Sequence, residues 1–99
     1  MRQRKVVLTA QTIDDLQAIH SYIELQAGSK IADGYIERLK SFIRGFDLAS
    51  ERGIQRSDIF AGLRIVGFEK RVTIGFVVDQ STVQVLRIFW SGRDWEHAF

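Results

Sequence analysis

The chain has 99 residues and a formal net charge of +2, and 45% of its residues are apolar. This length suits a single domain, which we assign to residues 1–99, and the apolar fraction is enough to bury one modest core. Cysteine is absent and there are only two histidines, which excludes disulfides and argues against cysteine-based or histidine-rich metal sites. We therefore expect neither a metal nor a cofactor, and the charge is well below that of a nucleic-acid-binding tail.

No stretch of the sequence approaches the roughly 20 apolar residues of a membrane-spanning helix. The basic residues at positions 2–5 precede an apolar stretch that is too short for a signal peptide. The sequence therefore predicts a cytoplasmic protein that does not associate with a membrane.

The first half of the chain predicts a strand and then a helix. Residues 4–10 are typical of a strand, and Thr12 is expected to cap a helix whose first turn carries Asp14 and Asp15. Gly28 is expected to end this helix. Apolar residues recur at the spacing of one buried helical stripe, at Ile13, Leu16, Ile19 and Ile23.

A second helix follows, for which Ser29 is the expected cap. Its apolar pattern is wide enough to contact both the first helix and a flat surface such as a sheet. The pattern comprises Ile31, Ala32, Tyr35, Ile36, Leu39, Phe42, Ile43 and Phe46. Because residues 27–29 leave little slack, the two helices are predicted to form a hairpin.

The second half predicts a loop at residues 50–60 and then three strands. These strands cover residues 62–68, 72–78 and 83–90, and the connections between them are short enough for an antiparallel meander. Gly62 and Gly75 fall inside the predicted strands and indicate local bends or a close approach of another backbone. The predicted fold is therefore α+β, in the order β-α-α-β-β-β, with an antiparallel sheet, a helical hairpin packed on one face and the other face open.

The last strand contains a cation in an apolar setting. Arg87 interrupts a run of β-branched and aromatic residues, and a guanidinium is costly to bury without a partner. We therefore expect Arg87 to face either an open groove or a carboxylate. Arg64 and Trp90 are further candidates for the wall of that groove, although Arg64 could instead pair with Glu69 or Asp79, and Trp90 could belong to the core.

The chain leaves this strand through Arg93, Asp94 and Trp95. A cation with five donors, an acid and a large aromatic ring are residue types that contribute strongly to protein interfaces. These three residues are the predicted target-binding site. The alternative is local: Arg93 pairs with Asp94 or Glu96, and Trp95 folds over the edge of the sheet.

Five short motifs follow one another along the chain. They are Asp-Leu-X-X-Ile-X-X-Tyr-Ile at residues 15–23, Ala-X-X-Tyr-Ile-X-X-Leu at residues 32–39, Gly-Leu-Arg at residues 62–64, Val-Leu-Arg-Ile at residues 85–88 and Gly-Arg-Asp at residues 92–94. In order and spacing the chain resembles the ParE-type toxins of the RelE/ParE superfamily. Trp90 departs from the family pattern, which commonly has histidine before Gly-Arg-Asp.

The resemblance implies the toxin of a type II toxin-antitoxin system. Such a protein inhibits DNA gyrase without being an enzyme and is neutralised by a cognate antitoxin of the ParD type. An antitoxin usually lays a helix and an extended segment across its toxin, burying an apolar groove. Tyr22, Ile36 and Phe42 are the candidate antitoxin-binding residues, and the alternative is that they are ordinary core residues.

The RelE branch of the superfamily offers a second hypothesis, a ribosome-dependent endoribonuclease that cleaves messenger RNA. Cleavage at a ribose hydroxyl needs a base, an acid and cations on the phosphate. Arg64, Arg87 and His97 could supply this set. However, the last tyrosine here is Tyr35 and the only lysine after Lys40 is Lys70, so the acid and base pairing usual in these nucleases is missing. A third hypothesis is a fold of this type that has lost its toxicity and persists as a binding module.

Overall fold

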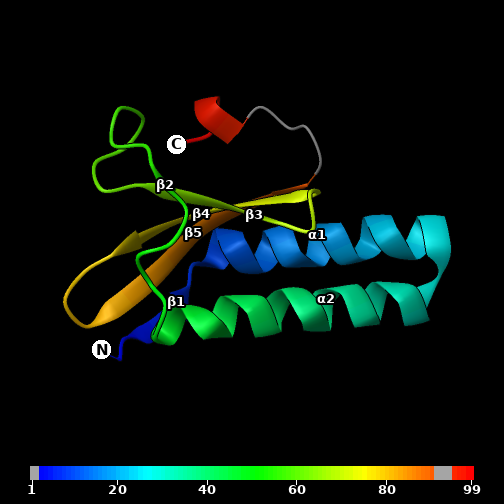
Figure 1. Ribbon diagram of the computed structural model, residues 1–99. Helices are drawn as coiled ribbons and strands as arrows, with labels where there is room; N and C mark the ends of the chain where they lie inside the picture. The colour runs from blue at the N-terminus through cyan, green and yellow to red at the C-terminus, as the bar shows by residue number, and fades with distance from the viewer. Residues whose placement is uncertain (1–2, 91–94) are drawn as a thin grey trace.

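The computed structural model describes residues 3–90 and 95–99. In chain order its elements are β1 (Lys5–Leu8), α1 (Ala10–Ala27), α2 (Ser29–Arg44), the 3-10 turn η1 (Gly45–Asp47), β2 (Ile54–Gln55), β3 (Arg64–Phe68), β4 (Val72–Val78), β5 (Thr82–Trp90) and the 3-10 turn η2 (Trp95–His97). The two helices form a hairpin along one face of the sheet, and η2 lies on the other side (Figure 1). The predicted α+β fold is therefore confirmed, with the short strand β2 added inside the predicted loop.

The sheet is mixed, whereas an antiparallel sheet was predicted. Its strand order is β1-β5-β4-β3-β2, and every neighbouring pair is antiparallel except β1 and β5. Lys5 lies opposite Thr82, and Leu8 lies opposite Val85, in parallel register. The helical hairpin returns the chain to the start of β1, and the meander of β3, β4 and β5 then ends on a strand that runs in the direction of β1.

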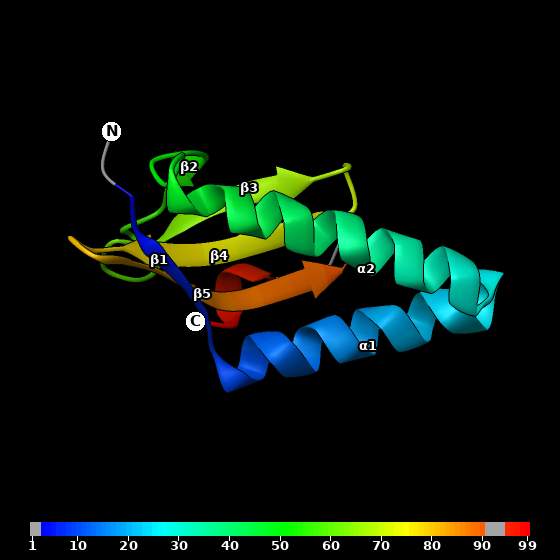
Figure 2. The ribbon, with the colours of Figure 1, turned by 90° about the horizontal axis from the view of Figure 1, so that it is seen from below.

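The main core lies between the helices and the sheet. Viewed from the helix side, α2 passes over β3 and β4, and α1 runs beside β5 (Figure 2). The largest fully buried side chains of this core are Phe46, Phe76, Leu39 and Ile74. The predicted stripes are correct apart from one residue at the start of each helix, because Ile13 is 47% exposed and Ile31 is 57% exposed.

The boundaries of the helices differ slightly from those predicted. Thr9, rather than Thr12, caps α1, and its Oγ1 accepts a hydrogen bond from the Thr12 amide at 3.1 Å. Thr12 continues the buried stripe of Leu16, Ile19 and Ile23 at four- and three-residue spacing, and Ile13, the next residue round the helix, is half-exposed. Gly28 ends α1 as predicted, with a φ of 93°, and the same residue precedes α2, so that Ser29 is the first helical residue and makes no side-chain cap.

A β-bulge breaks the register between β4 and β5. Phe76 lies opposite Val85, but Gly75 lies opposite Arg87, so β5 holds one extra residue at this point. Val85 and Ile88 can therefore both face the helices, while Arg87 faces the other side of the sheet. The irregularity predicted at Gly75 is present, whereas Gly62 lies before β3 rather than within a strand.

The face of the sheet opposite the helices is partly covered. Phe99 packs against Phe89, with ring centroids 5.8 Å apart, and approaches Phe60 at 6.5 Å. Phe89 is only 4% exposed even though it lies outside the main core. Segment 95–99 thus forms a small second apolar cluster on the face that was predicted to be open.

Candidate functional site

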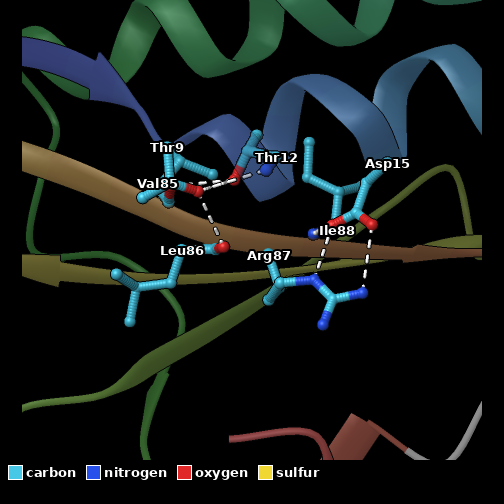
Figure 3. A network of polar contacts seen from close by, with 7 residues as sticks. All are labelled: Thr9, Thr12, Asp15, Val85, Leu86, Arg87 and Ile88. Carbon is cyan, nitrogen blue, oxygen red and sulfur yellow. Dashed lines mark hydrogen bonds and ion pairs between the residues drawn. The ribbon is translucent and has the colours of Figure 1, made fainter.

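The first turns of α1 are attached to the edge of β5 (Figure 3). Because β1 ends at Leu8, the later part of β5 has no strand on that side. Thr9 Oγ1 donates a hydrogen bond to the Leu86 carbonyl at 3.0 Å. Thr12 Oγ1 donates to the Val85 carbonyl at 2.8 Å. Hydroxyl groups at the start of α1 therefore bind carbonyls along this edge of β5, and the Val85 carbonyl also accepts a hydrogen bond from the Thr9 amide at 3.2 Å.

Asp15, one turn further along α1, holds the Arg87 guanidinium. Arg87 donates to the two carboxylate oxygens from Nε at 2.8 Å and from Nη2 at 3.1 Å, and the Ile88 amide also donates to Asp15 at 2.9 Å. The Asp15 and Arg87 side chains are only 13% and 21% exposed. The hydrogen bond to Asp15 raises the pKa of Arg87 above its ordinary value. Of the two predicted environments for Arg87, the structure places it beside a carboxylate.

Arg64 does not share a face with Arg87. Side chains alternate along β3, and Val66 and Phe68 pack on the main core, so Arg64 also lies on the helix side of the sheet. Its Nη1 donates to the Arg52 carbonyl at 3.2 Å. Of the two predicted acidic partners, Glu69 pairs with Arg38, and Asp79 accepts hydrogen bonds from the turn at residues 81–82.

Trp90 also lies on the helix side. Its ring packs against those of Tyr22 in α1 and Tyr35 in α2, with ring centroids 5.7 Å and 5.5 Å apart. The predicted groove residues Arg64, Arg87 and Trp90 are therefore not brought together on one open face. The alternative nuclease set is also divided, because η2, which contains His97, lies on the side of the sheet away from Arg64 (Figure 1).

Trp95 is the one residue of the predicted target-binding site that the structure describes. Arg93 and Asp94 lie outside the described residues. The Trp95 side chain is half-buried, and the Arg56 guanidinium lies 5.4 Å from its ring centroid. This cation–π contact links Trp95 to the loop that carries Arg56.

Arg56 is a residue that the sequence reasoning missed. Its guanidinium pairs with Asp58 at 2.9 Å and with Glu96 at 3.0 Å. Hydrogen bonds to these two acids raise the pKa of Arg56, and the same guanidinium lowers the pKa of Asp58. The only local signal was the spacing of Arg56 and Asp58 within a loop. It gave no indication of the second partner, Glu96, which lies 40 residues later.

The three predicted antitoxin-binding residues lie in different surroundings. Tyr22 is 48% exposed, Ile36 is buried at 7%, and Phe42 is half-buried against Phe46 and Phe68. Ile36 lies beneath a depression of about 580 Å³ between β1 and the two helices. Phe42 instead borders a second depression, of about 660 Å³, beside the loop at residues 48–52.

We call the first of these the hairpin depression. It is lined by Leu8, Ile13, Leu16, Gln17, His20, Ser21, Ile36 and Lys40. A smaller depression of about 190 Å³ adjoins it through Leu8 and Lys40 and adds Arg44. The floor is thus apolar and the rim toward α2 is basic, which suits an acidic, amphipathic segment.

The described residues give no sign of two other kinds of site. None of their helices combines the length and apolar character needed to span a membrane. Nor do three or more of their histidine, aspartate or glutamate side chains gather into a group that could hold a metal ion.

Residues 6–95 match the family model described as the ParE toxin of the type II toxin-antitoxin system parDE. The chain belongs to the ParE toxin family. It is thus a ParE-type toxin of a type II toxin-antitoxin system, as its motifs implied. No curated protein sequence is significantly similar to it.

The ParE fold is also found by comparison with solved structures. A chain of the chromosomal ParDE toxin-antitoxin system from P. aeruginosa superposes with a TM-score of 0.79 at 20% sequence identity. The alignment covers 90% of this chain and 97% of that chain. At this identity the likeness concerns the fold, so the surfaces described above have to be interpreted from this chain's own residues.

Proposed function

We propose that this ParE-family toxin inhibits DNA gyrase by binding it, without breaking a bond itself, and that a cognate antitoxin holds it inactive in the cytoplasm. The observation that carries this proposal is the separation of the charged groups that nuclease chemistry would need. A base, an acid and cations must converge on one phosphate to cleave RNA. Here Arg64 and Arg87 lie on opposite faces of the sheet. In addition, the Arg87 guanidinium is already bound by the Asp15 carboxylate.

The proposed target surface lies on the side of the sheet away from the helices. Trp95 is its described member, and Arg93 and Asp94 are proposed to act beside it. Tryptophan and arginine side chains are enriched among interface hot spots. The neighbouring Phe60 is 45% exposed, which extends the apolar surface available to a protein partner.

The proposed antitoxin surface is the hairpin depression together with the outer edge of β1. Within residues 3–90 and 95–99, β1 is the last strand on its side of the sheet, so its outer edge can accept an added strand. Ile13 offers a half-exposed apolar side chain there, and Lys40 and Arg44 offer charge to an acidic segment. Ile36 contributes from below, while Tyr22 and Phe42 are not among the residues that line the hairpin depression, and their part in antitoxin binding stays a prediction.

The proposal can be tested with the purified toxin and gyrase. We expect inhibition of DNA supercoiling and accumulation of cleaved DNA, while messages in a translation reaction remain intact. The antitoxin, obtained from the neighbouring gene, should restore supercoiling. Message cleavage that is lost in both Arg64→Ala and Arg87→Ala would instead establish the endoribonuclease.

The antitoxin surface has its own test. Ile13→Asp places a charge in the hairpin depression and should weaken antitoxin binding about tenfold or more, measured by calorimetry. Leu25→Asp is the matched control, because Leu25 lies on the same helix and is 85% exposed, away from the depression. Equal affinities for the two variants would place the antitoxin elsewhere.

A further inference from the structure

Phe99 occupies a space that exists only because residue 75 is glycine. A β-carbon built on Gly75 would lie 2.5 Å from Phe99 Cζ, which is closer than real β-carbons approach, and 3.3 Å from Phe99 Cε1, which is a tight contact. The Gly75 backbone has no positive φ and lies in the middle of β4, so glycine is not required there by conformation. The close contact with the aromatic ring is thus the constraint that accounts for glycine at this position.

Further contacts hold the rest of segment 95–99. Arg56 stacks on the Trp95 ring and pairs with Glu96, and the Ala98 amide donates to the Trp95 carbonyl at 3.1 Å. Arg56 is itself fixed, because its amide donates to the carbonyl of the fully buried Leu63 at 2.8 Å. The short turn is therefore attached to the protein at both ends, by Arg56 at its start and by Phe99 at its finish.

We propose that the Gly75–Phe99 contact and Arg56 position the Trp95 ring for target binding. Phe99 and Arg56 are positioning residues in this proposal, and Trp95 is the contact residue. The inference rests on the proposed function, since it assigns Trp95 to the surface that binds gyrase. A ring fixed before binding loses less conformational freedom on association, which increases affinity.

Gly75→Ala is the direct test, because the added methyl group displaces the tip of a side chain and leaves the strand intact. We expect the concentration for half-inhibition of gyrase to rise about tenfold, with antitoxin affinity unchanged. Gly67→Ala is the matched control on the neighbouring strand, because a β-carbon there would meet only the Val72 carbonyl at an ordinary 3.7 Å. Equal inhibition by the two variants would overturn the proposal.

A double-mutant cycle makes the test specific. Phe99→Ala alone should weaken inhibition as much as Gly75→Ala does, and combining them should add nothing, because both remove the same contact. Phe99→Ala also keeps the proposal testable if Gly75→Ala does not fold. Fully additive effects would contradict a shared contact.

A fluorescence measurement separates this inference from the proposed function. In a Trp90→Phe background, Trp95 is the only tryptophan. Gly75→Ala should shift its emission to the red relative to Gly67→Ala, because the freed ring becomes more exposed to water. If the wild-type toxin fails to inhibit gyrase, the proposed function is wrong, yet this shift still supports the positioning of Trp95. An unchanged spectrum overturns the positioning whatever the gyrase result.

Discussion

The two sides of the sheet are built in different ways. On the helix side, two helices and the inward residues of the strands form one continuous core, in which Phe46, Leu39 and Phe76 are fully buried. On the other side, a small aromatic cluster depends on Phe99 and on the exposed loop that carries Arg56. We infer that the helix side supplies most of the stability, whereas the other side can change its binding properties without unfolding the protein.

The largest effect is expected for Ile36→Asp. This substitution puts an unpaired carboxylate among core residues and should lower the free energy of unfolding by at least about 3 kcal/mol. Ile31→Asp on the same helix is the control, because Ile31 is 57% exposed and Ile36 only 7%. Chemical denaturation of both variants checks the difference. A cooperative, near-native transition for Ile36→Asp would mean that the helix side is not the main source of stability.

A smaller loss is expected for Asp15→Ala, which leaves Arg87 without its carboxylate and the Ile88 amide without its acceptor. Because the pair is partly exposed, we expect about 2 kcal/mol rather than the full cost of breaking a buried pair. The control is Asp14→Ala, one residue earlier and facing solvent. Similar urea midpoints for the two variants would show that the attachment of α1 to β5 contributes little.

Phe99→Ala should have a still smaller effect on stability, about 1 kcal/mol, because the ring is half-buried and its cluster is small. The same measurement on Phe46→Ala, in the main core, should give about 3–5 kcal/mol. Thermal melting of both variants compares the two sides of the sheet directly. Equal losses would remove the distinction between them.

The smallest expected effect is on the stability of the protein at low pH, through Asp58. The hydrogen bond from Arg56 lowers the pKa of Asp58 below its ordinary 3.8. An acid with a lowered pKa contributes stability above its unfolded value, and this contribution is lost as the pH falls through the folded value. The melting temperature of the wild type should therefore exceed that of Asp58→Asn at neutral pH, and the difference should disappear as the pH drops below 3.8. A difference that persists at low pH would assign the effect to something other than this ion pair.

Much of the fold could be predicted because its signals are local. The wide apolar pattern of α2, the glycine at position 28 and the alternation in β4 each act over a few residues and predicted the corresponding elements. The parallel pairing of β1 could not be predicted in this way, since strand direction depends on the path of the whole chain. Ile13 is exposed because the polar Thr12 takes its place in the buried stripe of α1, which the spacing of apolar residues alone does not reveal.

The candidate site was harder to predict because its contacts join residues that are far apart in the sequence. Arg87 was expected to need either an open groove or a carboxylate, but the sequence could not identify Asp15, 72 residues earlier, as the partner. The contact between Gly75 and Phe99 likewise depends on two segments that meet only in the folded chain. Residue chemistry thus indicated what Arg87 required, while the tertiary fold decided what supplied it.

The attachment of α1 to β5 also has a consequence for synthesis. Hydrogen bonds from Thr9 and Thr12 and the ion pair of Asp15 all reach residues at least 72 positions later in the chain. A nascent chain can form its helical hairpin early, but it lacks the strand on which the first helix and β1 both depend until that strand leaves the ribosome. Of the described strands β5 is made last, so a chain interrupted before it would leave α1 and β1 without the strand on which both pack.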